Sequence, residues 1–346
     1  MADLILYLGI TALGYFAGSK MRDIRGKLTW TGKVQTIAIT VLVLLMGMRM
    51  GSNEEITENL STIGLSALVF TIITVALSVA AITITRKFFG LDRYGRFVKT
   101  TAKIRNKEDE KNERALEKIE DEVENLAEKE AEEEENHGIS SMTIYILVAV
   151  VVGMLLGYFV IRNSFAGNIE TFDKGAGLGI KIGLCILLGF VGIDLGLEGT
   201  VIENFKKVGL RILIFPVAVI MGTLVGAMIS GLVLGLSMKE SLSIGAGFGW
   251  YTLAPGIIME AGFLKASAIS FLHNVMRELS AILLIPLVAK KVGYIETTGM
   301  PGAAAMDVCL PIVEKSTRGD IAVYSFVSGV VLSFIVPVLV PLFIGM

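Results

Sequence analysis

Polar and charged side chains interrupt one long apolar stretch of this 346-residue chain. The stretch 264–289 is long enough to span a bilayer, and His273, Asn274, Arg277 and Glu278 lie near its middle. A charge at the centre of a membrane helix costs about 2.5–3.5 kcal/mol on insertion scales, and such residues usually face a wet cavity or a partner. Their presence therefore indicates a functional site inside the membrane.

A second acid, Asp307, follows in the glycine- and proline-rich stretch 299–307. Together with Glu278 it indicates a path for a cation or a proton. If the two acids share one cavity, low dielectric and mutual repulsion favour a proton on one of them, and that proton could be exchanged for an ammonium group. The alternative is that Arg277 neutralises an acid such as Asp307 in a structural ion pair.

The spacing within 264–289 decides which of these side chains can act together. Asn274 and Glu278 are four residues apart and stack on one face of a helix, whereas His273 and Arg277 stack on the neighbouring face. Arg277 and Glu278 therefore point in different directions. Their adjacency in the sequence does not by itself make them an ion pair. His273 is the weakest candidate, because a satisfied polar residue is commoner than a proton relay.

Glycines precede two aromatic residues in the stretch 241–261, where Gly247 and Gly249 lead into Trp250 and Tyr251. Unpaired amides at the start of a broken helix can hold a carboxylate, and the rings can meet a cation or an aliphatic chain. The two aromatic residues could equally anchor the protein at a membrane interface. No strand precedes the glycines, so a nucleotide site is rejected.

Composition excludes a soluble globule, because 53% of the residues are hydrophobic and only 18% are charged. We predict an all-α integral membrane protein with about eight transmembrane helices and inverted repeats. The predicted spans are roughly 4–19, 33–50, 62–86, 140–161, 177–195, 208–236, 264–289 and 321–345. Two further apolar stretches, 241–261 and 299–313, are rich in helix breakers and are predicted to be re-entrant or broken-helix hairpins.

Basic residues cluster in the first connection, after the third span, before the sixth and at the end of the seventh. The positive-inside rule puts all four clusters in the cytoplasm, which places both termini outside. We expect a multi-pass protein of the cell inner (plasma) membrane, surrounded by the lipid bilayer and without a nucleic-acid partner. Cys185 and Cys309 are far apart and lie in apolar segments, so we expect no metal and no cofactor.

An internal repeat organises the chain. The segment from Gly47 to Leu65 matches the segment from Gly192 to Leu210 at a constant offset, and each copy follows a Gly-x-x-x-Gly helix. An odd number of spans per unit inverts the second copy, as in secondary transporters. We divide the chain into a first repeat (1–90), a charged cytoplasmic insertion (91–138), a second repeat (139–238) and two hairpin-span pairs (239–346).

Three motifs carry a resemblance to a known family. They are Gly247-Phe248-Gly249-Trp250-Tyr251, then Asn274-x-x-Arg277-Glu278-Leu279 with Ile285-Pro286, and Gly302-Ala303-x-x-Met306-Asp307-x-x-Leu310-Pro311. In order and spacing the chain resembles the LysO family of bacterial and archaeal L-lysine exporters. The resemblance covers nearly the whole chain except the acidic block 106–136. Ala254, Pro255, Ala304 and Ala305 depart from the small or hydroxyl-bearing residues of the family, which affects the expected substrate range.

The resemblance implies a transporter, not an enzyme, that exports L-lysine or a close cationic analogue in exchange for protons. It implies that Glu278 and Asp307 are the critical acid pair. The ε-ammonium would meet this pair, and the α-carboxylate would meet hairpin amides or Arg277. Sodium- or proton-coupled transport of another small organic solute is the nearer alternative. An intramembrane carboxylate enzyme is the remote one, because it needs two acids on closely facing elements.

Overall fold

The computed structural model describes residues 2–21, 30–95, 141–164, 169–197, 210–317 and 319–346. Within these ranges the chain is built of helices and short turns, without a β-strand. The acidic block 106–136 and almost all of the predicted insertion 91–138 lie outside the described residues. The predicted all-α class is confirmed.

Seven helical segments of the described chain are long and apolar enough to cross a membrane. They are α2 (Trp30–Ser52), α4 (Leu60–Phe88), α6 (Ser141–Leu156) continued by the π-turn η3 (Gly157–Ile161) and α7 (Arg162–Ser164), α8 (Ile169–Leu197), α10 (Ile214–Leu234), α13 (Leu264–Lys291) and α16 (Gly319–Ile344). The remaining predicted span is α1 (Ala2–Lys20), which packs along α8. Each of the eight predicted positions therefore holds a helix.

Broken helices occupy the two stretches that are rich in glycine and proline, as predicted. The first contains α11 (Met238–Gly245) and α12 (Leu253–Glu260), and the second contains η5 (Gly302–Met306) and α15 (Leu310–Ser316). Ser237 begins α11 with a reciprocal capping box to Glu240. Two short helices were not expected, namely α3 (Glu54–Glu58), which Asn53 caps, and α14 (Tyr294–Thr297).

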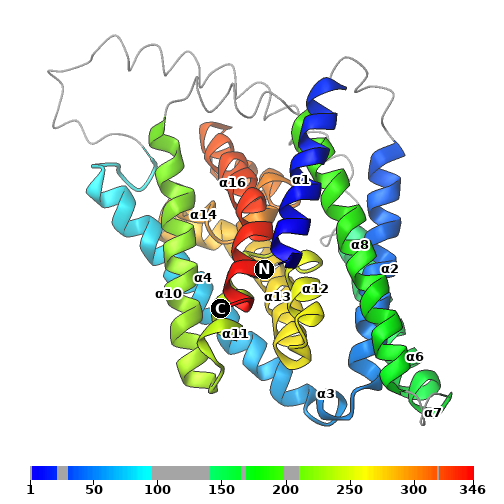
Figure 1. Cartoon of the computed structure of the whole chain (residues 1–346). Helices are drawn as coiled ribbons and strands as arrows, with labels where there is room; N and C mark the ends of the chain where they lie inside the picture. Colours follow the sequence, from blue (N-terminus) through cyan, green and yellow to red (C-terminus); the bar gives the residue numbers. More distant parts are fainter. Residues whose placement is uncertain (1, 22–29, 96–140, 165–168, 198–209, 318) are drawn as a thin grey trace, which may run out of the picture.

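The helices pack in two units (Figure 1). The four-helix unit contains α1, α2, α6–α7 and α8, in which α1 packs on α8 and α2 packs on both α6 and α8. The hairpin unit contains α4, α10 and the elements from α11 to α16, with α13 packed on α4 and α16 packed on η5. The units meet where α12 contacts α8 and α2, and where α1 contacts α16. Each predicted repeat thus contributes two long helices to one unit and one to the other.

Glycines allow the close helix crossings of the four-helix unit. A Cβ atom at Gly47 of α2 would lie 2.6 Å from the carbonyl oxygen of Val150 in α6, too close for any side chain. Gly192 of α8 occupies the equivalent place in the second copy, where a Cβ atom would overlap the carbonyl oxygen of Thr11 in α1. Backbone approach of this kind lets apolar helices associate in lipid, where the hydrophobic effect supplies no drive.

Equivalent positions of the two copies make equivalent contacts. Gly14 faces backbone of α8 in the way that Gly153 faces backbone of α2. Ser78 of α4 and Thr223 of α10, which also occupy equivalent places, share a hydrogen bond of 2.7 Å between their hydroxyl oxygens. The two three-helix copies therefore make matching contacts at these positions. These contacts support the predicted repeat, whose inverted relation and boundaries stay predictions.

The Gly47 crossing generates a stability prediction. Gly47→Val should lower the free energy of unfolding by about 1–3 kcal/mol, because the added methyls force α2 and α6 apart. Gly32→Val on the same helix is the matched control, since no atom lies within 4 Å of a Cβ atom there. Apparent unfolding temperatures of both variants in one detergent test this, and equal losses would contradict the role of the crossing.

Candidate functional site

The broken segments of the two hairpins cross each other inside the hairpin unit. The amide of Ala303 donates a hydrogen bond of 2.8 Å to the carbonyl oxygen of Phe248. Gly249 and Gly302 have φ angles of +94° and +72°, which favour glycine. A Cβ atom on Gly302 would also overlap the carbonyl of Phe248. The crossing therefore requires glycine in two of the three motifs that carry the family resemblance, at Gly249 and at Gly302.

Asn274 connects α13 to the first break. Its Oδ1 accepts a hydrogen bond of 2.7 Å from the amide of Gly249, and its Nδ2 donates to the carbonyl oxygen of Ser270 at 2.8 Å. A Cβ atom at Gly247 would lie 2.7 Å from that Nδ2, so a glycine there leaves room for the amide side chain. Asn274 is fully buried, and its contacts hold the backbone of the break in place.

Arg277 connects α13 to the second hairpin. Its Nε donates to the carbonyl oxygen of Met300 at 2.9 Å, and one terminal nitrogen donates to the carbonyl oxygen of Gly299 at 3.1 Å. The guanidinium also reaches the hydroxyls of Thr223 at 3.3 Å and Ser78 at 3.5 Å, where α10 and α4 cross. It is fully buried and makes no ion pair with a described residue. The alternative in which Arg277 neutralises Asp307 in a structural ion pair is therefore wrong, since both residues are described and no ion pair joins them.

The two acids lie on elements that touch. Glu278 is only 2% exposed on α13, one residue after Arg277. Asp307 is half-buried at the end of η5, where its Oδ1 accepts a hydrogen bond of 2.7 Å from the amide of Val308. Helix α13 contacts both η5 and α15, the elements on either side of Asp307. This packing is compatible with a shared site for the two acids, which stays a prediction.

The amides of the first break are occupied within the protein. Gly249 donates to Asn274, and the other four amides of residues 247–251 donate to carbonyl oxygens within 3.2 Å. The expectation that these glycines leave unpaired amides for a carboxylate is therefore wrong. Trp250 and Tyr251 are half-buried and pack against the main hydrophobic core, which contains residues of both units. Their predicted contact with a cation or an aliphatic chain stays a prediction.

His273 completes the polar set on α13. It is fully buried, its Nδ1 lies 2.9 Å from the hydroxyl of Thr71, and its ring packs on Phe70. This contact with α4 fits the interpretation of a structural residue. Among the described residues, no group of three or more His, Cys, Asp and Glu side chains has an arrangement that could hold a metal ion.

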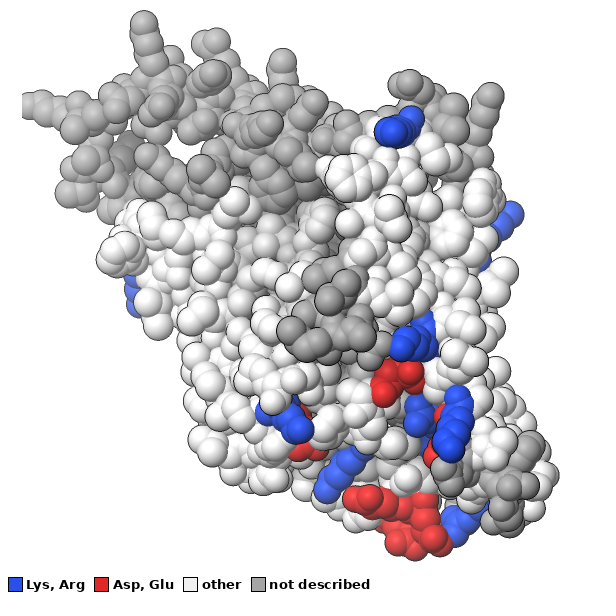
Figure 2. All heavy atoms as spheres, in the orientation of Figure 1, with Lys and Arg blue, Asp and Glu red and all other residues white. Residues whose placement is uncertain are grey.

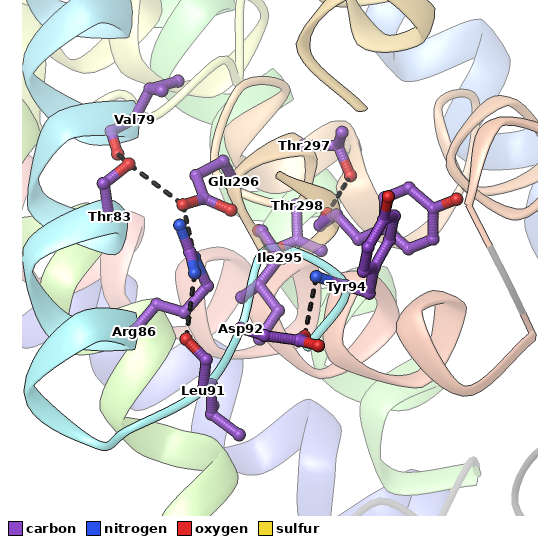
Figure 3. Close-up of polar contacts among 11 residues, drawn as sticks. Val79, Thr83, Arg86, Leu91, Asp92, Tyr94, Ile295, Glu296, Thr297 and Thr298 are labelled. Carbon is purple, nitrogen blue, oxygen red and sulfur yellow. Dashed lines mark hydrogen bonds and ion pairs between the residues drawn. The ribbon is translucent and has the colours of Figure 1, made fainter. Parts of the chain in front are cut away.

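Sequence reasoning missed a buried ion pair between α4 and α14 (Figure 3). The Nε of Arg86 lies 2.7 Å from Oε1 of Glu296, which also accepts a hydrogen bond of 3.0 Å from Thr83. Glu296 is fully buried, and Arg86 further donates to the carbonyl oxygen of Leu91 at 2.9 Å. The only sequence signal was an acid in a short connection after Lys291, and Arg86 itself was read as part of a cytoplasmic basic cluster.

A second charged cluster also went unrecognised. Arg49, in the last turn of α2, contacts Asp173 of α8 and Glu260 of α12. Arg49 lies just before α3 in the chain, and exposed acidic and basic side chains gather at the end of the bundle that carries α3 and α7 (Figure 2). Arg49 falls within the repeated glycine motif, but the motif alone does not identify its partners.

Helices long and apolar enough to cross a membrane, with two broken hairpins packed among them, define a multi-pass membrane protein. The family model described as lysine exporter LysO matches residues 147–344, which include α8, α10 and both hairpins. The match covers more than half of the chain, and the chain belongs to this family.

Two curated relatives align with the chain. It is 31% identical over 160 residues to the lysine exporter LysO of Escherichia coli, and the alignment covers 46% of this chain and 53% of that protein. It is 30% identical over 203 residues to a candidate lysine exporter of Haemophilus influenzae, covering 57% of this chain and 96% of that protein. The chain thus spans about half the length of the first relative. No solved structure matches it.

The hydrogen bonds of the Arg277 guanidinium to the second hairpin generate a second prediction. Arg277→Lys should destabilise the protein by about 1–3 kcal/mol for each backbone carbonyl left without a donor, because an ammonium cannot reproduce the planar guanidinium. Arg93→Lys is the control, since Arg93 is exposed and donates to the carbonyl of Lys290. Unfolding of both variants in detergent measures the difference. Equal stability of the two variants would contradict the positioning role of Arg277.

The buried ion pair between Arg86 of α4 and Glu296 of α14 generates a third prediction. Glu296→Gln should lower the free energy of unfolding by about 3–5 kcal/mol, because the charge of Arg86 is left uncompensated in the interior. Glu54→Gln, which removes an exposed partner of Arg162, should change it by no more than about 0.5 kcal/mol. Denaturation curves monitored by tryptophan fluorescence compare them, and similar midpoints would count against a stabilising ion pair.

Proposed function

We propose that this protein exports L-lysine, or a close cationic analogue, from the cytoplasm by exchange for protons. Membership of the lysine exporter family and the names of the two relatives support the substrate. The observation that carries the mechanism is the burial of Glu278 on α13, a helix whose side chains bond to both hairpin breaks. A carboxylate in that position is the natural partner for an ammonium group or a proton.

Glu278 and Asp307 are the proposed binding groups for the ε-ammonium and for the returning proton. The contacts of α13 with η5 and α15 support their joint action. A carboxylate that binds an ammonium must first lose its proton, so binding of the two cations is mutually exclusive at that group. This exclusion is the chemical basis of exchange in the proposal.

Asn274 and Arg277 act as positioning residues in this proposal. Each forms at least one hydrogen bond with the backbone of a hairpin break, which supports a role in shaping the site. The occupied amides of residues 247–251 argue against those amides as partners of the α-carboxylate. Trp250 and Tyr251 remain candidates for contact with the aliphatic part of the cargo.

Exchange with protons also suits the energetics of export. Moving one positive charge outward against an inside-negative potential costs about 2.3 kcal/mol per 100 mV. One returning proton per lysine offsets this charge movement. We place the protein in the cell inner membrane with both termini outside, which puts the basic end of α4 in the cytoplasm. Rocking of inverted repeats would give the site alternating access.

Flux measurements test the proposal. In proteoliposomes loaded with labelled lysine, an imposed proton gradient should drive lysine release through the wild-type protein. Glu278→Gln and Asp307→Asn should each lose this gradient-driven flux, because an amide neither titrates nor pairs with an ammonium. Glu55→Gln is the matched control, since Glu55 is exposed on α3.

The alternatives give different outcomes in the same vesicles. If a sodium gradient drives flux and a proton gradient does not, the coupling ion is sodium and not the proton. If another solute is transported and lysine is not, the assignment of lysine as the substrate is wrong. Full activity of both acid variants would rule out the acidic site, whatever the cargo.

A further inference from the structure

Arg49 lies where the four-helix unit meets the hairpin unit. Its Nε is 3.4 Å from Oδ1 of Asp173, and its Nη1 is 3.5 Å from Oε1 of Glu260. Arg49 and Asp173 come from α2 and α8 of the four-helix unit, whereas Glu260 ends α12 of the hairpin unit. One guanidinium thus links an acid from each unit at the end of the bundle that carries α3.

The surroundings leave room for this cluster. Gly177 lies one turn after Asp173 on α8, and a Cβ atom there would lie 3.3 Å from Oε1 of Glu260 and 3.6 Å from Nη1 of Arg49. A larger side chain at this position would press on both charged groups. The side chain of Arg49 is 10% exposed, and its Nε has no hydrogen-bond partner. The arginine is therefore mostly enclosed but incompletely bonded.

Comparison with the pair of Arg86 and Glu296 shows what kind of link this is. Arg86 and Glu296 both belong to the hairpin unit, are 2.7 Å apart and leave the carboxylate fully buried. The contacts of Arg49 cross between the units, are longer, and involve acids whose side chains are 38% and 18% exposed. The first pair stabilises one unit. The second can break when water reaches its acids, and breaking it removes a polar link between the units at that end.

We propose that Arg49, Asp173 and Glu260 form an ion-pair lock that holds the two units together at the outer end of the transport path. Its link to transport rests on the proposed function: an exported cation carries the same charge as Arg49 and can take its place beside Glu260 or Asp173. Arrival of the cargo then weakens the link between the units, and departure of the cargo restores it. The lock thus makes opening at this end depend on a cationic cargo.

A distance measurement without any cargo tests the lock itself. Spin labels are placed on Thr171→Cys of α8 and Lys265→Cys of α13, which are exposed on the two units, after Cys185→Ala and Cys309→Ala. In nanodiscs, Arg49→Ala and Glu260→Gln should each add a longer-distance population to the wild-type distribution. Arg162→Ala, which removes an arginine paired with exposed Glu54 at the same end, should leave the distribution unchanged.

Charge exchange guards against variants that merely misfold. The double variant Arg49→Glu with Glu260→Arg restores opposite charges across the boundary and should return the distribution towards that of the wild type. Lysine added to the wild-type protein should increase the longer-distance population, as removal of Arg49 does. Distances in Arg49→Ala that equal those of Arg162→Ala would overturn the lock.

Failure of the lock and failure of the proposed function remain distinct. If wild-type vesicles show no lysine flux while Arg49→Ala still lengthens the distance, the lock stands and lysine is not the cargo. If lysine flux is normal while Arg49→Ala and Glu260→Gln leave both distance and flux unchanged, the lock is wrong and the transport function stands.

Discussion

The structure depends on a guanidinium held inside a membrane helix without a carboxylate partner among the described residues. Arg277 is stabilised by backbone carbonyls of the second hairpin and by hydroxyls of α4 and α10. Burying this charge requires such donor–acceptor contacts, because an unpaired charge in low dielectric is very costly. The irregular backbone of the second break is therefore stable inside the hairpin unit, because its free carbonyl oxygens accept hydrogen bonds from Arg277.

Asn274 does for the first break what Arg277 does for the second, and both lie on α13. Helix α13 therefore bonds to both hairpin breaks, and Glu278 lies one residue after Arg277 on this helix. If Glu278 is held in place by α13, it can be exposed to the two sides of the membrane in turn only if whole groups of helices move around it. The division into a four-helix unit and a hairpin unit supplies bodies of that kind.

Backbone-to-backbone packing holds the four-helix unit together, whereas charges contribute where the units are joined. Glycine crossings such as that of Gly47 exclude side chains and give a rigid contact. By contrast, the long contacts of Arg49 reach acids that are partly exposed, so water and dissolved ions can compete for them. The proposed lock of Arg49, Asp173 and Glu260 lies at the boundary between the two units, where contacts of the second kind occur.

The sequence by itself determined the membrane helices, the two broken hairpins and the polar set on α13, because length, hydropathy and helix breakers act locally. It also predicted a repeat, because glycines of the two copies recur in register. Only the tertiary structure decided that Arg277 binds carbonyls rather than an acid, and that the amides of residues 247–251 are occupied. Only it paired Arg86 with Glu296 and Arg49 with Glu260. Those partners are distant along the chain, and no local pattern specifies which buried donor meets which acceptor.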